Sequence, residues 1–235
     1  MIVAQRKGIE EVKKMVERHS KILIAGCGTC VAVCMAGGER EVSILASMLR
    51  MAFKLDSGKK VEIGEITTER QCDREFIVPF DKKMREYDVV ISTACGIGVQ
   101  FLADFLGDIP VVPGVNTKFL GSNEGEGTWL ERCRACGECV LGDTGGICPI
   151  TICAKNLLNG PCGGTNKGKC EVDADKDCAW TLIYRRLEKL GGLDNIRKIF
   201  PPKNYHAQTH PSRLVHEAYQ KEERNDTEDQ TATGI

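Results

Sequence analysis

The chain lacks any long run of apolar residues. A membrane-spanning helix needs roughly 20 predominantly apolar residues in succession, and no stretch of the 235-residue sequence approaches this length. The charged N-terminal segment, with Arg6, Lys7, Glu10 and Glu11, is not followed by the apolar core of a signal peptide. We therefore expect a cytoplasmic protein with no membrane partner.

An excess of charge of either sign is also missing. The 32 Lys and Arg residues and the 33 Asp and Glu residues leave a net charge of −1. This balance provides no broad attraction to nucleic acid or to anionic lipid, so no nucleic-acid partner is expected. A hydrophobic content of 42% and a charged content of 28% are ordinary for a globular chain of one large or two small domains.

The sequence shows no evident pairing of acid and base residues for catalysis. His206, His210 and His216 follow no regular ligand spacing. Cysteine, by contrast, is abundant, with 13 in the chain. Without a secretion signal, this abundance favours metal binding over disulfides. The odd count and the short gaps between neighbouring cysteines also argue against disulfides.

Eight of the 13 cysteines lie in the second half of the chain, where Cys133, Cys136 and Cys139 form a C-x2-C-x2-C run. Two-residue gaps let three thiolates turn toward one centre, as in ferredoxin-type [4Fe-4S] sites. Cys148 precedes a proline, as the fourth ferredoxin cysteine does, but its gap is longer, so the fourth ligand stays open. Zinc is the weaker alternative, because it more often uses two C-x2-C pairs.

Four further cysteines follow: Cys153, Cys162, Cys170 and Cys178. Their uneven spacing leaves open whether they hold a second cluster or a zinc ion. The apolar content of this region is low, so we expect metal binding to replace much of the hydrophobic core.

The N-terminal half alternates short apolar stretches with amphipathic ones. We expect helices over residues 8–19, 39–55, 81–87 and 97–106, and strands over 21–25, 61–66, 88–93 and 109–112. This order predicts the α/β class, with a Rossmann-like parallel sheet covered by helices on both faces.

Five more cysteines follow the predicted strands: Cys27, Cys30, Cys34, Cys72 and Cys95. The carboxyl ends of parallel strands meet at one edge of a sheet, where ligand sites form. We therefore expect four of the five to hold another [4Fe-4S] cluster. Ordinary buried cysteines are the alternative interpretation.

A dinucleotide-binding loop is the other interpretation of this place, since Gly26 and Gly28 follow a strand. However, Cys30 lies within the motif, and Val31 occupies the position of the last glycine. The pattern is therefore too incomplete to favour a nucleotide.

Residues 116–128 are rich in glycine and predict a linker. We therefore divide the chain into a Rossmann-like domain with a cysteine cluster (1–125), a cysteine-rich iron–sulfur domain (126–200) and an extended tail (201–235). Helices are expected over 179–190 and 193–200 in the second domain. The polar end, residues 220–235, is expected to be disordered.

The motifs C-x2-C-x2-C, C-P, N-G-P-C-G-G and D-C-A-W between Cys133 and Trp180 resemble the cysteine-rich C-terminal domain associated with methylenetetrahydrofolate reductases. The N-terminal G-C-G-T-C-x3-C resembles the MetV-type iron–sulfur small subunit of acetogen-type reductases. This resemblance implies a partner subunit of barrel fold that carries a flavin, with further electron-donor subunits as an open question.

The resemblance further implies electron transfer to or from that flavin, in the conversion of methylene- to methyl-tetrahydrofolate. About two or three [4Fe-4S] clusters are expected, with zinc as an alternative for one of them. A zinc-stabilised scaffold without a redox role is the main alternative function, and a stand-alone enzyme at the N-terminal cysteines is a lesser one. The tail over residues 201–219 is predicted to clamp the flavin subunit.

Overall fold

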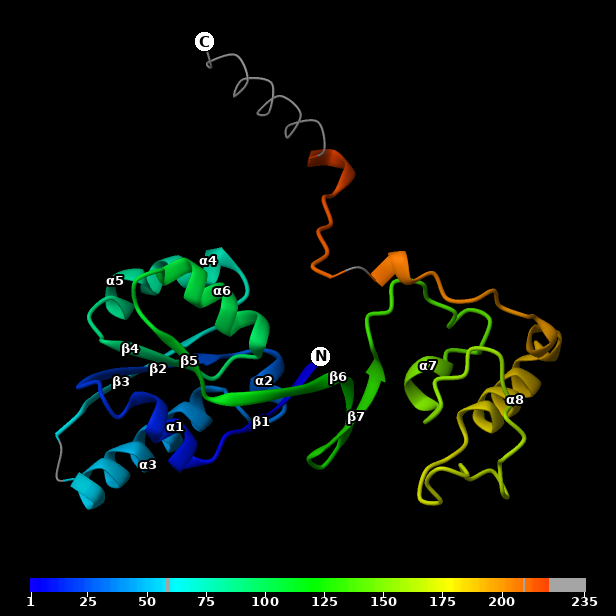
Figure 1. Cartoon of the computed structure of the whole chain (residues 1–235), viewed down its shortest axis with the longest axis horizontal. Helices are drawn as coiled ribbons and strands as arrows, with labels where there is room; N and C mark the ends of the chain where they lie inside the picture. Colours follow the sequence, from blue (N-terminus) through cyan, green and yellow to red (C-terminus); the bar gives the residue numbers. More distant parts are fainter. Residues whose placement is uncertain (58–59, 209, 220–235) are drawn as a thin grey trace, which may run out of the picture. The chain divides into compact units, whose positions relative to one another are not determined.

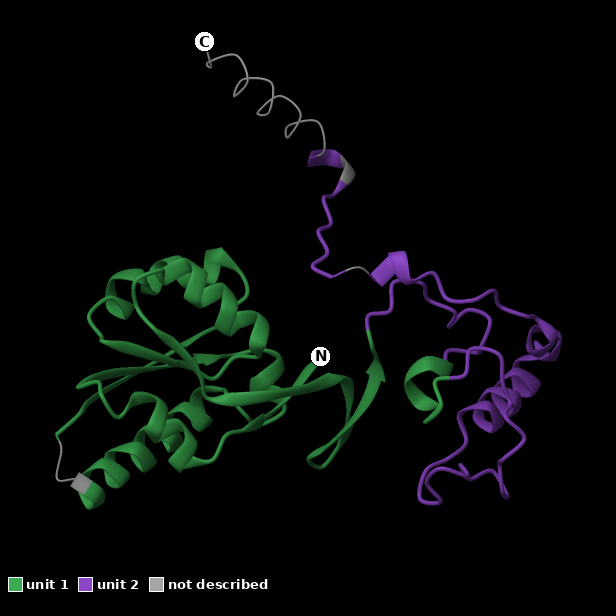
Figure 2. Ribbon diagram, in the orientation of Figure 1, with its two compact units in different colours: residues 1–134, 148–156 green, residues 135–147, 157–235 purple. Residues whose placement is uncertain are grey.

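The computed structural model describes residues 1–57, 60–208 and 210–219. The chain divides into two compact units (Figure 2). The first contains residues 1–134 and 148–156, and the second contains residues 135–147 and those from 157 onward. The predicted disorder of residues 220–235 lies outside the described part. Within the described part, no helix is both long and apolar enough to cross a membrane.

A parallel sheet of four strands, in the order β3-β2-β4-β5, forms the centre of the first unit. The strands are β2 (Lys21–Cys27), β3 (Glu62–Thr68), β4 (Val89–Ser92) and β5 (Val111–Pro113). Both β2 and β4 are internal strands with apolar sequences, and they are buried over almost their whole length. The predicted α/β class and the parallel sheet are confirmed.

Helices cover both faces of this sheet (Figure 1). On one face, α1 (Ile9–Val16) and α3 (Glu39–Ser57) place their apolar residues against the strands. On the other face lie α4 (Arg74–Ile77), the 3₁₀ turn η1 (Val78–Phe80), α5 (Asp81–Met84) and α6 (Gly96–Leu106). Each helix buries the stripe of side chains that its 3.6-residue period brings to one side.

The first unit also contains an antiparallel sheet that the sequence did not predict. Its strands are β1 (Ile2–Arg6), β6 (Val115–Gly125) and β7 (Thr128–Cys133), in the order β1-β6-β7. The predicted linker over 116–128 is therefore wrong, because these residues form a β-hairpin. Its turn, Glu126 and Gly127, has positive φ angles of 40° and 77°. Gly121 is needed where the strands pair, since an added Cβ would lie 2.1 Å from the Leu130 carbonyl oxygen.

The second unit contains little regular structure besides α8 (Ala179–Leu190), which matches the predicted helix. The helix ends at Gly191, whose φ of 68° is left-handed, as is common after a helix. Its buried residues are Ala179, Trp180, Ile183 and Leu187. The second predicted helix is the short 3₁₀ turn η2 (Leu193–Arg197).

The tail continues through the 3₁₀ turns η3 (Tyr205–Gln208) and η4 (Glu217–Tyr219). Its first part is attached to the second unit itself. The Asn159 side chain donates to the Phe200 carbonyl and accepts from the Phe200 N–H, both at 2.8 Å. An added Cβ on Gly137 would lie 2.2 Å from the Ala207 carbonyl oxygen. Residues up to about Ala207 therefore pack on their own unit.

Candidate metal centre

Three of the predicted ligands lie at the carboxyl edge of the parallel sheet. Cys27 is the last residue of β2, Cys95 precedes α6 directly after β4, and Cys72 lies in the loop after β3. The sheet order places β2 between β3 and β4, so the three strand ends are neighbours. Cys72 is exposed, whereas Cys27 and Cys95 are only 7% and 9% exposed.

The other two N-terminal cysteines belong to the short helix α2 (Cys30–Val33) that follows β2. Cys30 is its first residue, and Cys34, 6% exposed, follows its last. Cys34 shares one buried cluster with Cys27 and Cys95. The structure thus brings these cysteines to one edge, as the strand order predicts.

The thiols at this edge affect one another electrostatically. Burial raises the pKa of Cys72, and the neighbouring Cys27 and Cys95 raise it further. Burial likewise raises the pKa of Cys34, with Cys30 adding to the effect and hydrogen bonds to the backbone opposing it. Both shifts favour the neutral thiol, and a bound cation would reverse this preference. In the described part of the chain, no three Cys, His, Asp or Glu side chains form a group suited to a metal ion.

A buried glutamine that the sequence analysis missed connects the strand ends. Gln71, 1% exposed, donates its side-chain amide to the carbonyls of Ala25 and Gly26 at 2.8 and 2.9 Å. Its oxygen accepts from the Ser92 hydroxyl at 2.6 Å, and that hydroxyl accepts from the Ala94 N–H at 3.3 Å. A lone glutamine in a loop has no periodic signal. Its position directly before a predicted ligand is the only sequence clue.

Residues of the antiparallel sheet pack against the cysteine edge. The Cys34 sulfur accepts from the Ala4 N–H of β1 at 3.4 Å and donates to the Ala4 carbonyl at 3.6 Å. Phe119 of β6 and Trp129 of β7 pack against the buried cluster. The Trp129 indole N–H is buried and has no hydrogen-bond partner in the described structure. A cavity of about 480 Å³ lies beside these residues and includes Cys34 in its lining.

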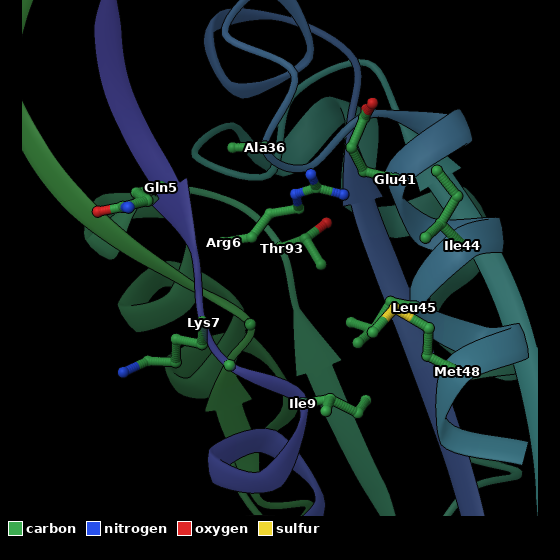
Figure 3. Close-up of a pocket in the computed structure, with 12 residues that line it drawn as sticks. Gln5, Arg6, Lys7, Ile9, Ala36, Glu41, Ile44, Leu45, Met48 and Thr93 are labelled. Carbon is green, nitrogen blue, oxygen red and sulfur yellow. The ribbon is translucent and has the colours of Figure 1, made fainter. Parts of the chain in front are cut away.

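A second cavity of about 480 Å³ lies between the end of β1 and the first half of α3 (Figure 3). The Arg6 guanidinium extends into it near Thr93 and Glu41, whereas Gln5 and Lys7 point away. Its apolar lining comprises Ile9, Ala36, Ile44, Leu45 and Met48. The Glu41 carboxylate accepts from the Gly38 N–H at 3.2 Å, which caps α3 in the manner of a capping box.

The C-x2-C-x2-C run is divided between the two units. Cys133 is the last residue of β7 in the first unit, while Cys136 and Cys139 belong to the second. Cys148 and Cys153 flank the short helix α7 (Pro149–Ile152), which packs against β7 within the first unit. The structure thus places Cys133 near the helix that carries Cys148 and Cys153.

The remaining cysteines, Cys162, Cys170 and Cys178, lie in the second unit. The Gly164 N–H donates to the Cys162 sulfur at 3.4 Å. Cys178 precedes α8. Burial opposes its ionisation, yet hydrogen bonds from Thr181, Thr165 and the Trp180 backbone lower the pKa of Cys178 overall. Such bonds to sulfur stabilise the thiolate, the form that binds metal. All 13 cysteines are free thiols in the structure.

Comparison with curated proteins and comparison with solved structures each gave no match. A comparison with protein families did give one. Residues 112–206, which include all eight cysteines of the second half of the chain, match the family model described as methylene-tetrahydrofolate reductase C terminal.

Proposed function

We propose that this chain is an iron–sulfur subunit that passes electrons to or from the flavin of a partner methylenetetrahydrofolate reductase subunit. The main support is the family match over residues 112–206, because that segment contains the densest cysteine motif. The two sheets of the described residues have three and four strands and do not form a (β/α)₈ barrel. In this proposal the folate chemistry takes place on the partner.

The N-terminal centre would be a [4Fe-4S] cluster held by four of Cys27, Cys30, Cys34, Cys72 and Cys95, on a Rossmann-like sheet. Thiolates are the ligands of such clusters, and the five thiols follow or end strands and a helix at one edge of the sheet. They would have to draw closer together than they lie in this structure to ligate one cluster. A bound cluster would store and release single electrons. The protein's part is to hold the thiols, to exclude water around Cys27, Cys34 and Cys95, and to leave the Cys72 side open to solvent.

The cysteine-rich region would hold the remaining metal. Cys133, Cys136 and Cys139 would supply three ligands of a ferredoxin-like set, with Cys148 as the candidate for its open fourth position, and Cys153, Cys162, Cys170 and Cys178 would be the others. Zinc is the second candidate for the last set. N–H groups are directed at the sulfurs of Cys162 and Cys178, an arrangement that suits a thiolate site of either metal. A zinc-stabilised scaffold without a redox role is the corresponding alternative function.

Metal analysis of the full chain, purified anaerobically, tests the proposal. We expect iron and acid-labile sulfide in equal amounts, and an EPR signal of reduced [4Fe-4S] that appears on reduction with dithionite. Zinc as the only bound metal would refute electron transfer and support the scaffold.

A second experiment tests the partner. The chain is reduced, desalted and mixed anaerobically with a flavin-bearing methylenetetrahydrofolate reductase subunit. The flavin absorbance is then followed by stopped flow. We expect the flavin to be reduced as the cluster is oxidised. Serum albumin that has been reduced and desalted in the same way is the control for carried-over reductant.

A further inference from the structure

One buried hydrogen-bond network reaches the residue before each of three cysteines. Gly26 precedes Cys27, and its carbonyl accepts from the Gln71 amide. Gln71 itself precedes Cys72. Ala94 precedes Cys95, and its N–H donates to the Ser92 hydroxyl, which in turn donates to Gln71. Three loops from three strands are thus connected through a single side chain.

We propose that Gln71 is a positioning residue that holds Cys27, Cys72 and Cys95 in one arrangement before any metal binds. The proposal rests on the proposed function only for the identity of the metal. The thiols themselves do not contact Gln71 in the hydrogen bonds described. It acts on them through the backbone of the preceding residues.

Burial is what makes this network suitable for positioning. Gln71 and Ser92 are 1% and 0% exposed, so water cannot replace a lost partner, and an unpaired polar group there would be costly. The Gln71 amide has two donors, and each has a backbone acceptor. The position of the Gln71 amide is therefore fixed by both carbonyls, and a movement of the Gln71 loop would break both hydrogen bonds.

The packing around Gln71 also supports a positioning role. Gly98, buried in the first turn of α6, lies against it, and an added Cβ there would lie 3.0 Å from the Gln71 Cβ and 2.7 Å from the Ala94 Cβ. The absence of a side chain at Gly98 lets the Gln71 loop approach the start of α6. Cys95 immediately precedes this helix.

In the described structure, neither Gln71 nor Ser92 forms a hydrogen bond with Cys30, Cys34 or the residues beside them. Cys34 is held instead by the backbone of Ala4 and Val31, and Cys30 belongs to α2. A change at Gln71 should consequently disturb Cys27, Cys72 and Cys95 together and leave Cys34 as it was. A general loss of stability would instead expose all four of these cysteines.

The test measures alkylation of individual cysteines in the metal-free full chain by iodoacetamide and mass spectrometry. In the wild type, the buried Cys27 and Cys95 should react slowly. In Gln71→Met, which preserves volume but removes the donors, both should react at least ten-fold faster, while Cys34 keeps its rate. Equal rates for Cys27 and Cys95 in both proteins would overturn the inference.

Two control variants separate positioning from general destabilisation. Gln100→Met removes a similar amide, which donates to the Gly96 carbonyl at 3.0 Å but is exposed, and should change nothing. Thr93→Val removes buried hydroxyl bonds to the carbonyls of Ala25 and Gly37 without touching Gln71. If Thr93→Val accelerates Cys27 and Cys95 as strongly as Gln71→Met does, Gln71 has no special role. If Gln71→Met does not fold, Ser92→Ala takes its place, with the same pattern expected at a smaller amplitude.

A second arm repeats the measurement after anaerobic reconstitution with ferrous iron and sulfide. Reconstitution should protect Cys27, Cys72 and Cys95 of the wild type from alkylation. Gln71→Met should lose this protection, while Cys136 and Cys139 of the ferredoxin-like set should keep theirs. Absence of protection in the wild type would refute the N-terminal cluster, yet the metal-free arm would still decide the role of Gln71. Full protection in Gln71→Met would count against positioning.

Discussion

Substitution of Gly37 by alanine should destabilise the first unit strongly. Gly37 is buried in the segment that leads from α2 to α3. Its carbonyl accepts from the Cys27 N–H at 3.0 Å and from the Thr93 hydroxyl at 2.9 Å. An added Cβ would lie 1.9 Å from the Thr93 carbonyl oxygen. Because that oxygen belongs to the backbone, no rotamer change can relieve the clash.

The magnitude follows from the contacts that must be given up. Overpacking costs about 1–3 kcal/mol, and each hydrogen bond that the shifted segment loses costs about 0.5–1.5 kcal/mol. If both bonds to the Gly37 carbonyl are lost, the free energy of unfolding should fall by about 2–6 kcal/mol. For a chain of this size, where each 1 kcal/mol corresponds to about 2–4 °C, the Tm should fall by roughly 4–24 °C.

Thermal unfolding of the metal-free chain, followed by circular dichroism under reducing conditions, measures this effect. Gly8→Ala is the matched control, because nothing lies within 4 Å of its added Cβ and its φ of −63° suits any residue. Its Tm should change by less than about 2 °C, because the weaker preference for alanine at an N-cap and the lower conformational entropy that alanine gives the unfolded chain act in opposite directions. A Tm for Gly37→Ala within this margin of the wild type would show that the segment yields without cost, and that the reasoning is wrong.

Four further predictions concern other parts of the chain. Serine at Cys72 or Cys95 should remove one cluster's share of iron, measured against the wild type, and unchanged iron in both variants would exclude the N-terminal centre as proposed. Asp88 accepts from the N–H groups of Lys21 and Ser20, which lower the pKa of its carboxyl group. The stabilisation of the folded state by the Asp88 carboxylate is therefore fully present above the unfolded pKa of about 3.9. It is lost as the pH falls through the lower pKa of the folded state. The Tm difference between wild type and Asp88→Asn should close below about pH 4, and a constant difference would contradict this. Trp180→Phe removes the indole bond to the Leu157 carbonyl at 3.0 Å and should cost about 1–3 kcal/mol, whereas an unchanged midpoint of urea unfolding would rule out a structural role for that bond. Truncation after Gln208 should weaken binding of the flavin subunit, measured by calorimetry, without changing iron content, and full binding by the truncated chain would disprove the clamp.

Much of the first unit could be predicted because its signals are local. The apolar run of β2 and the helical spacing in α3 each reflect the period of one element, which the sequence contains directly. The predicted and observed elements differ mainly at their ends. For the same reason, the position of Cys27, Cys72 and Cys95 after strands could be predicted together with the strands themselves.

The antiparallel sheet shows where such reasoning ends. The strand β1 pairs with β6, with Ile2 opposite Leu120, although more than 100 residues separate the two strands in the chain. Nothing in the sequence of either strand indicates which strand it will pair with. The glycines of β6 resemble those of a linker when considered alone. Only the pairing explains them, since Gly121 lies too close to the Leu130 carbonyl for any side chain.

The sequence by itself determined which thiols are available and that three of them follow parallel strands. Tertiary structure decided how these thiols are held. Gln71 lies 46 residues from Ala25 and 21 from Ser92 in the chain, and its bonds exist only once three loops have met in a buried place. Cysteine spacing is a covalent property that is visible in any conformation, whereas a buried hydrogen-bond network is a property of the folded state alone.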